Sequence, residues 1–315
     1  MTFARSVSAR LRVTRKRTVM NDTSPRKSRR SLAVAASMVG MVSLAIGAHA
    51  ALNNRTDAGK DADKVVMTEQ SAADPAKAGS RIALVIGNGH YPDAAAPLSQ
   101  PINDARELSS ALRRDGFDVD VVEDASKDDM ARAVARLKDR IGPDSVVMLF
   151  FGGYGVQVGR ESYMLPVDAV IWKESDVRRD GISVEQVLAA MQAQGARAKL
   201  AVIDASRRNP YERRFRSFSH GLAPIDAPDN ALILSSATPG QVADDSTDTH
   251  SVLVAELLTH VTEQAAGAES IFNKTRIAIA KATDGAQVPS VSSSLLEEIR
   301  IGADTTAATA DKAGG

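Results

Sequence analysis

Two apolar runs of the chain end in short turns that carry hydroxyl groups and a carboxylate. Residues 149–157 read LFFGGYGVQ and place Tyr154 in a glycine turn, whereas residues 200–211 read LAVIDASRRNPY and contain Asp204 and Ser206. A serine hydroxyl becomes a nucleophile when a neighbouring base takes its proton. Tyrosine, with a pKa of about 10, is about one part in a thousand phenolate at pH 7. Ser206 beside Tyr154 is therefore expected to be a poor nucleophile beside a poor base.

Few residues offer an alternative to this pair. The chain has 0 Cys, which excludes a thiol nucleophile and any disulfide. His90, His220 and His250 are the candidate bases, and their simpler interpretation is a surface turn, a polar loop and a helix cap. The sequence also lacks the spacing of a metal site or of a nucleotide-binding loop, so we expect no metal and no cofactor.

The elements that must position these residues form one continuous pattern. Short, uninterrupted apolar runs predict buried parallel strands, and runs with a 3.6-residue period predict helices between them. We expect Asn103 and Asp104 to cap the first helix, and Ser183 and Gln186 to form a capping box. The expected strands are 82–86, 117–122, 145–151, 199–204, 231–236 and about 287–293. The expected helices are about 102–115, 126–141, one that starts at 183 and has Val184, Val187, Leu188 and Met191 on its apolar face, 251–264 and 270–283.

Alternating strands and helices predict the α/β class. The expected architecture is a three-layer αβα sandwich around a mostly parallel sheet of about six strands. Such sheets place their sites at the carboxyl ends of the strands. The turns at 152–154, 205–206 and 237–238 all fall there, so the sequence predicts that they lie at one edge of the sheet.

Six segments, in order, resemble the caspase-like peptidases (family C14), on the bacterial, metacaspase-related side. The resemblance covers about residues 80–302, which we expect to be the folded domain. It implies a catalytic His where this chain has Tyr154 and a catalytic Cys where it has Ser206. The segments are RIALVIGNGHY (81–91), PINDARELSSAL (101–112), MLFFGGYGVQ with YMLPVDA (148–157 and 163–169), AVIDASRRNP (201–210), SSATPGQVADD (235–245) and QVPSVSSSL (287–295).

The resemblance also implies roles for neighbouring residues. Gly155 follows the His position and corresponds to a backbone donor of the oxyanion hole. Asp204 corresponds to an acid that lines a pocket for a basic side chain, although hydrogen bonding to backbone is an equal alternative. Ser290 stands where an aromatic residue is common. The resemblance therefore predicts a paired replacement of both reactive residues, with a contact between the Tyr154 and Ser206 hydroxyls.

Other residues near the serine have simpler interpretations. Tyr163, Arg207, Asn209 and Pro210 are expected to stabilise the fold rather than contact a ligand. A basic cluster follows the serine turn, and most such runs are solvated loops, although some bind acidic partners. This cluster comprises Arg207, Arg208, Arg213, Arg214 and Arg216.

The beginning of the chain predicts export. Residues 1–30 carry ten Lys/Arg and one Asp, and residues 32–48 form an uncharged stretch that ends in Ala48-His49-Ala50. This order is typical of a secretory signal over residues 1–50. Arg29-Arg30 resembles a twin-arginine signal, or simply ends the basic region, and Met20 rather than Met1 is an alternative start. Residues 51–79 are expected to be a flexible linker, and residues 303–315 a disordered tail.

Together these observations predict an exported, periplasmic or secreted caspase-like pseudopeptidase that is inactive as a cysteine protease. We expect it to bind a protein or peptide, with an active caspase-like relative as one candidate, and not nucleic acid. Membrane attachment is the alternative if the signal is not cleaved. The alternative function is a Ser206-dependent hydrolase, which needs a histidine within hydrogen-bonding reach of Ser206.

Overall fold

The computed structural model describes residues 79–92, 97–211, 221–243, 248–262 and 266–302. The expected signal segment, linker and tail lie outside these residues, apart from Gly79. No helix among the described residues has the length and apolar character needed to cross a membrane.

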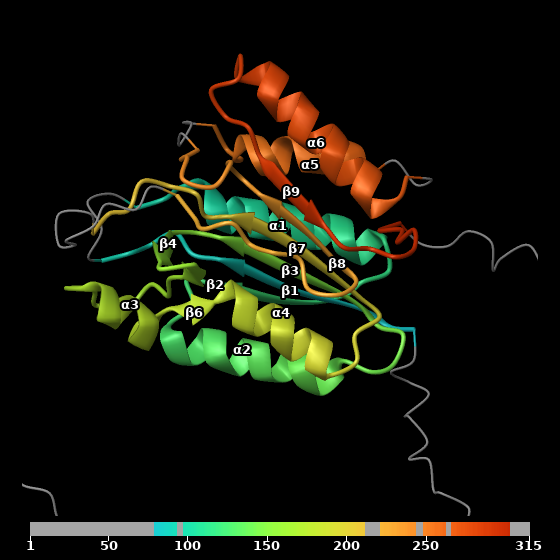
Figure 1. The fold of residues 1–315 in the computed structure, drawn as a ribbon, viewed down its shortest axis with the longest axis horizontal. Coiled ribbons are helices and arrows are strands. Elements are labelled where there is room, and N and C mark those ends of the chain that lie inside the picture. Colours follow the sequence, from blue (N-terminus) through green and yellow to red (C-terminus); the bar gives the residue numbers. More distant parts are fainter. Residues whose placement is uncertain (1–78, 93–96, 212–220, 244–247, 263–265, 303–315) are drawn as a thin grey trace, which may run out of the picture. The chain divides into compact units, whose positions relative to one another are not determined.

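A six-stranded sheet forms the centre of the fold, in the order β2-β1-β3-β7-β8-β9. The first five strands run parallel, and β9 pairs antiparallel with β8 at one edge. The predicted α/β class and mostly parallel sheet are therefore confirmed (Figure 1). The strands are β1 Arg81–Gly87, β2 Asp118–Glu123, β3 Val146–Gly152, β7 Ala198–Asp204, β8 Ala231–Ser235 and β9 Ser290–Ser293.

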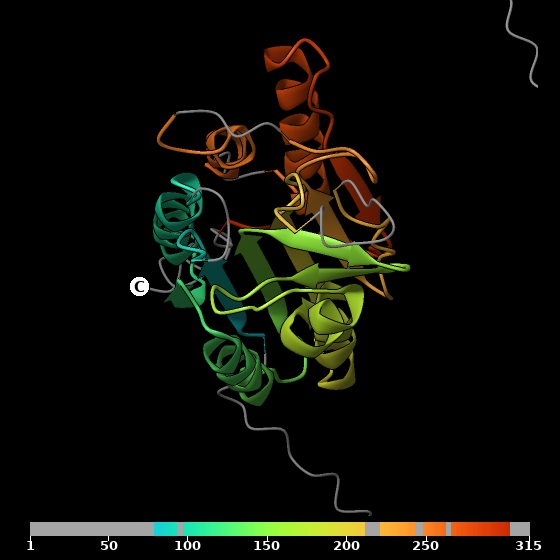
Figure 2. The ribbon, with the colours of Figure 1, turned by 90° about the vertical axis from the view of Figure 1, so that its left-hand side faces the viewer.

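Helices cover both faces of this sheet, as Figures 1 and 2 show. Helices α1 (Gln100–Arg114), α5 (Val252–Val261) and α6 (Ala268–Ala282) pack on one face. Helices α2 (Lys127–Arg140) and α4 (Val184–Ala193) pack on the other. Strand β1 shows why its apolar run is uninterrupted: Ala83 and Val85 lie in the first core, whereas Ile82, Leu84 and Ile86 lie in the second.

A second, smaller sheet was not predicted. Strands β4 (Gly155–Val158), β5 (Glu161–Met164) and β6 (Ile182–Ser183) pair antiparallel in the order β4-β5-β6, and helix α3 (Glu174–Asp180) lies beside them. β4 begins directly after Tyr154. The small sheet therefore continues from the turn that carries the first candidate site residue.

The helix caps differ from the prediction in two places. Helix α1 begins after Ser99 with no side-chain cap bond, and the buried Asp104 instead accepts the Ser251 N–H at the start of α5. Ser183 Oγ accepts the Gln186 N–H at 3.2 Å and its hydroxyl donates to Glu185. The second bond of a capping box, from the Ser183 N–H to the Gln186 side chain, is not present among the described residues. Asp104 is thus a contact between two helices rather than a local cap.

Candidate functional site

The ends of β3 and β7 bring the two candidate residues to the same edge of the sheet. The two strands are neighbours, and Gly152 at the end of β3 pairs with Asp204 at the end of β7. Tyr154 and Ser206 each follow two residues later, and their exposed fractions are 9% and 1%. The predicted meeting of these turns at the carboxyl ends of the strands is confirmed.

The expected contact between the two hydroxyls is wrong. Ser206 donates its backbone N–H to Ser236 Oγ (3.2 Å), and its carbonyl accepts from the Ala243 N–H (2.6 Å). Within the described part of the chain, no hydrogen bond joins Ser206 to Tyr154. Tyr154 instead packs its ring against Tyr91, with ring centroids 4.9 Å apart and an interplanar angle of 66°. The edge-to-face contact is a favoured aromatic geometry.

Tyr91 is a site residue that the sequence reasoning missed. Its hydroxyl donates to the Leu165 carbonyl (3.0 Å) and accepts the Tyr154 N–H (3.0 Å). Burial raises the pKa of the Tyr91 phenol above its ordinary value, so this group stays protonated at neutral pH. Tyr91 thus fixes the backbone at position 154. The sequence does place Tyr91 in the segment GNGHY, directly after a turn that ends a strand, and this position could have identified it as a residue of the same sheet edge.

Gly155 lies where two strand ends approach closely. Its N–H, the candidate oxyanion donor, hydrogen-bonds to the Ala205 carbonyl at 3.2 Å. A Cβ at position 155 would lie 2.9 Å from that carbonyl oxygen and 2.7 Å from Leu222 Cδ2, so the approach requires glycine. In this conformation the Gly155 and Ser206 N–H groups are both donated to groups of the protein itself.

Arg207 joins the two strand ends. One guanidinium nitrogen, Nη1, donates to the carbonyls of Gly153 (3.0 Å) and Asp204, and lies 3.5 Å from Asp204 Oδ1. The side chains of Arg207 and Asp204 are 4% and 3% exposed. The expectation that Arg207 stabilises the fold is confirmed, but its place in a solvated basic loop is wrong. Arg208 is exposed, and the other arginines of that cluster lie outside the described residues.

Asp204 faces its own arginine on one side only. Its Oδ1 has the Arg207 contact, whereas its Oδ2 is buried and has no hydrogen-bond partner within the described structure. Among the described residues, no backbone N–H donates to the Asp204 carboxylate, which was the alternative interpretation of this residue. A buried carboxylate oxygen without a donor is costly, so this one requires a physical explanation.

A second carboxylate contributes to the electrostatics of this region. Burial, and then the negative charge of Asp204, raise the pKa of Asp104 to about 6. Asp104 Oδ1 accepts from or pairs with His250 Nδ1 at 2.9 Å and also receives the Ser251 N–H. The Asp204 carboxylate at the end of β7 and the Asp104 carboxylate of α1 therefore influence each other electrostatically, the first beside Arg207 and the second beside His250.

Two of the three candidate histidines, His90 and His250, are described, and each contacts an aspartate. His90 is exposed, and its Nδ1 contacts Asp124 Oδ2 at 2.6 Å, as its surface-turn interpretation predicts. His250 contacts Asp104 and does not cap α5, because Ser251 Oγ accepts the Val254 N–H there. His220 lies outside the described residues. Neither His90 nor His250 hydrogen-bonds to Ser206.

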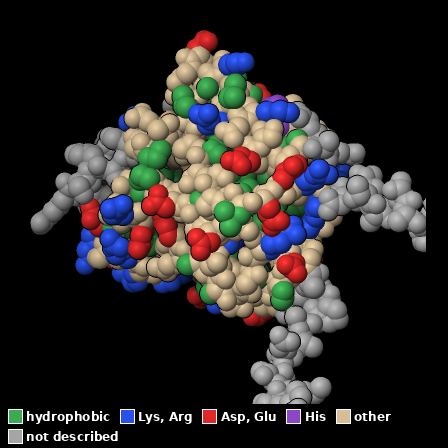
Figure 3. Space-filling view, turned by 45° about the vertical axis from the view of Figure 1, so that its right-hand side comes forward, with side chains coloured by type: hydrophobic (Ala, Val, Ile, Leu, Met, Phe, Trp, Pro, Cys, Tyr) green, Lys and Arg blue, Asp and Glu red, His purple; other side chains and the backbone are tan. Residues whose placement is uncertain are grey.

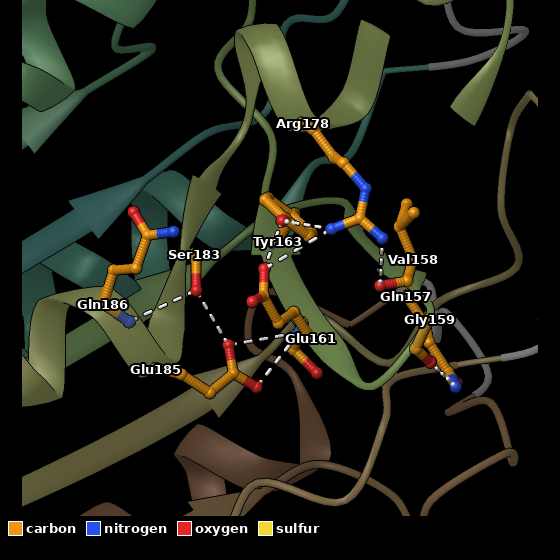
Figure 4. A network of polar contacts seen from close by, with 10 residues as sticks. Gln157, Val158, Gly159, Glu161, Tyr163, Arg178, Ser183, Glu185 and Gln186 are labelled. Carbon is orange, nitrogen blue, oxygen red and sulfur yellow. Dashed lines mark hydrogen bonds and ion pairs between the residues drawn. The ribbon is translucent and has the colours of Figure 1, made fainter. Parts of the chain in front are cut away.

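A polar network holds the hairpin that follows Tyr154, as Figure 4 shows. Arg178 of α3 reaches the Tyr163 hydroxyl (3.1 Å) and the Val158 carbonyl (3.3 Å), and Tyr163 donates to Glu161. The Glu185 carboxylate accepts the Ser162 N–H at 3.0 and 3.2 Å. Burial raises the pKa of Glu185, and these donors act in the opposite direction. The network fixes β4 and β5, and with them the position of Gly155.

Metal ligands do not gather in the described structure: no three His, Asp or Glu side chains there are placed to hold an ion. The residues at the two strand ends themselves offer hydroxyl groups, the Asp204 carboxylate and the buried Arg207 guanidinium.

Comparison with known proteins identifies the family. The family model of the caspase domain, peptidase family C14, matches residues 80–299. The chain belongs to this family.

Human mucosa-associated lymphoid tissue lymphoma translocation protein 1 is 28% identical over 145 residues, a match that spans 46% of this chain and 17% of that protein. A crystal structure of protein GSU0716 from Geobacter sulfurreducens superimposes with a TM-score of 0.52 at 16% identity, covering 71% of this chain and 99% of the other. The structural match supports the caspase-like fold alone.

Proposed function

We propose that this caspase-family chain is an exported pseudopeptidase that binds a polypeptide instead of cleaving it. Its ligand is a protein or peptide, and an active caspase-like relative that it regulates is one candidate. The observation that carries the proposal is the paired presence of Tyr154 and Ser206 at the strand ends where the family resemblance expects His and Cys.

Three features of the site favour binding over hydrolysis. Neutral tyrosine donates a hydrogen bond but accepts a proton poorly, so Tyr154 is a weak base for the Ser206 hydroxyl. Tyr154 is also turned onto Tyr91 instead of bonding to Ser206. The Gly155 and Ser206 N–H groups are donated to Ala205 and Ser236, so a tetrahedral oxyanion would have to displace existing bonds.

Asp204 provides the binding feature of the same site. Its Oδ2 has no hydrogen-bond partner among the described residues, and the negative charge of Asp204 extends to Asp104, whose pKa it raises. A lysine or arginine side chain of a ligand would supply the donor that Oδ2 lacks. The proposal therefore favours a ligand with a basic side chain at this position.

The test compares turnover and binding on the same protein. Purified chain is incubated with fluorogenic peptides that end in Arg, Lys or Asp, with Ser206→Ala as the control. We expect no turnover above the Ser206→Ala level, and measurable binding of the Arg or Lys peptides that weakens in Asp204→Asn. Turnover that Ser206→Ala abolishes would overturn the proposal in favour of the Ser206-dependent hydrolase.

Export is tested separately, because it depends on the leader alone. Residues 1–50 supply the basic region, the uncharged stretch and the Ala48-His49-Ala50 site. We expect the full chain, expressed in a bacterium, to be recovered from the periplasm or medium with its N-terminus beyond Ala50. If the twin-arginine route is used, Arg29→Lys with Arg30→Lys should retain it in the cytoplasm. Recovery of an unprocessed chain in the membrane fraction would support the anchored alternative.

A further inference from the structure

A pocket lies where the parallel strands of the central sheet begin, at the opposite end of the strands from Tyr154 and Ser206. Its volume is about 320 Å³, and we call it the arginine pocket. Figure 3, which brings forward the right-hand side of Figure 1, shows Lys and Arg side chains gathered beside Asp and Glu side chains near the right of the molecule. The residues that line the pocket include Gly79, Arg81, Asp144, Arg197, Glu298 and Arg300.

The three arginines come from three parts of the chain. Arg81 begins β1, Arg197 directly precedes β7, and Arg300 follows β9 in the last described segment. By contrast, the groove beside β9, which is lined by residues of α6 and of the chain that leads into β9, has a single arginine, Arg276, among its lining residues. The presence of three guanidinium groups distinguishes the arginine pocket from that groove.

Arg81 is held in place by the end of the domain. Its Nη1 donates to the carbonyls of Ile301 (2.6 Å) and Gly302 (2.7 Å), and its guanidinium carbon lies 5.8 Å from the centre of the Phe117 ring. A guanidinium that is already fixed in this way loses little further freedom when a ligand binds. Arg81 therefore provides a preorganised positive charge on the wall of the pocket.

Arg197 and Arg300 are held more loosely. Each has one ionic contact among the described residues, from its Nε to a glutamate oxygen at 3.4 Å: Arg197 to Glu297 and Arg300 to Glu298. Their side chains are 43% and 46% exposed, and exposed pairs of this kind contribute little to stability. The terminal Nη groups of both arginines have no partner in the described structure, so they are available to a ligand.

We propose that the arginine pocket binds a small phosphate monoester, with the phosphate group held by Arg81, Arg197 and Arg300. A carboxylate has two oxygens in one plane, and a single guanidinium satisfies both. A phosphate group presents three acceptor oxygens in different directions and carries about two negative charges at pH 7. It therefore matches guanidinium groups that come from three parts of the chain.

The rest of the pocket indicates what the phosphate is attached to. Its volume lies within the range of small-molecule sites and leaves room beyond a phosphate group. Asp144 and Glu298 also line the pocket, and their carboxylates accept hydrogen bonds from hydroxyl groups but repel a second anionic group. The ligand is thus a phosphate ester whose remaining part is uncharged and carries hydroxyl groups, as in a sugar phosphate.

This site is separate from the proposed binding function at Asp204. The arginine pocket depends on the beginnings of β1 and β7 and on the segment that contains Arg300, whereas Asp204 lies where β7 ends. The pocket also takes an anion, whereas Asp204 is proposed to take a basic side chain. Each proposal can therefore fail without the other.

The experiment measures binding of glucose 6-phosphate to the purified chain by isothermal titration calorimetry at low ionic strength. Glucose tests the need for the phosphate, glucuronate replaces the phosphate with a carboxylate, and inorganic phosphate tests the need for the sugar. Arg197→Gln and Arg300→Gln are compared with Arg160→Gln, which removes an exposed arginine of the turn between β4 and β5, outside the pocket.

We expect glucose 6-phosphate to bind at one site per chain and glucose to give no heat of binding. Glucuronate and inorganic phosphate should each bind about tenfold or more weakly, because the first loses charge-assisted hydrogen bonds and the second loses the hydroxyl contacts. Arg197→Gln and Arg300→Gln should each weaken binding of glucose 6-phosphate by about tenfold or more, whereas Arg160→Gln should change it by less than about twofold.

The wild-type chain decides the matter if a glutamine variant misfolds. A ligand that binds only the folded state stabilises it, so glucose 6-phosphate should raise the melting temperature of the wild-type chain and glucose should not.

Four outcomes would overturn the proposal. The first is no binding of glucose 6-phosphate. The second is binding of glucuronate or inorganic phosphate as tight as that of the sugar phosphate, because the site would then select a carboxylate or a bare ion. The third is unchanged binding in both Arg197→Gln and Arg300→Gln. The fourth is a loss in Arg160→Gln as large as theirs, because the attraction would then be diffuse and not located in the pocket.

Discussion

Two arginines show how differently two regions of this molecule use their polar groups. At the end of β7, the buried Arg207 donates to two carbonyls and faces the Asp204 carboxylate. In the groove beside β9, the buried Nε of Arg276 has no acceptor. The strand ends that carry the family's reactive positions are thus joined by internal contacts, whereas the groove beside β9 contains a buried donor without an acceptor among the described residues. The family resemblance directs attention to the first region, where Asp204 Oδ2 has no donor. The second region also contains a buried polar atom without a partner, the Arg276 Nε.

The largest expected effect tests whether the strand ends can still support catalysis. Tyr154→His together with Ser206→Cys restores a base and a thiol, and general base catalysis contributes roughly 10²- to 10⁴-fold. We expect the double variant to hydrolyse reporter peptides ending in Arg or Lys at least about 100-fold faster than either single variant. Initial rates for all three variants give the comparison. A Ser206→Cys single variant as fast as the double one would show that the base at 154 is not what the site lacks.

The next prediction concerns the stability of the same region. Arg207→Met removes one partner of a buried pair and leaves the Asp204 carboxylate without its cation. We expect the free energy of unfolding to fall by about 3–5 kcal/mol. Arg208→Met is the matched control, because Arg208 is the adjacent, exposed arginine, and it should change the unfolding free energy by less than about 0.5 kcal/mol. Equal effects of the two substitutions in urea denaturation would contradict the role of Arg207 as the link between β3 and β7.

The sequence predicted the parts of these regions that depend on local patterns, and missed the parts that depend on contacts between residues far apart in the chain. The parallel strands were recognisable because each is buried on both faces, which produces runs such as IALVI at 82–86. The short hairpin β4–β5 was not, because its four-residue strands are stabilised by Arg178 and Glu185 from other elements. Local signals cannot reveal such partners.

The site shows the same limit. The positions of Tyr154, Gly155, Asp204 and Ser206 at one sheet edge followed from the strand pattern. Their contacts did not, because the Tyr154 ring is held by Tyr91, which lies 63 residues earlier in the chain. Asp104 was expected to cap its own helix, yet it contacts Ser251, 147 residues later. Pairings over such distances in sequence leave no periodic signal.

Titration of Asp104 offers a smaller test of the strand-end region. Its pKa is raised from 3.8 to about 6 in the folded chain, so the folded state holds this proton more tightly than the unfolded state does. The resulting contribution favours folding below about pH 4 and is lost as the pH rises through about 6. We expect Asp104→Asn to remove this part of the decline in the unfolding free energy between pH 4 and 6, measured by urea titration against the wild-type chain. If the difference in unfolding free energy between the two proteins is the same at pH 4 and pH 6, the titration of Asp104 does not cause the decline.

The smallest effect completes the comparison of the two arginines. Arg276→Met removes a buried donor that has no acceptor, so no partner is left unpaired by the change. We expect the unfolding free energy to stay the same or to rise by up to about 1 kcal/mol, the opposite of the loss at Arg207. Methionine preserves the apolar part of the side chain, so its packing against the groove is retained. Thermal denaturation of Arg276→Met and Arg207→Met under the same conditions makes the contrast direct. A loss at Arg276 as large as that at Arg207 would show that this guanidinium is satisfied inside the fold.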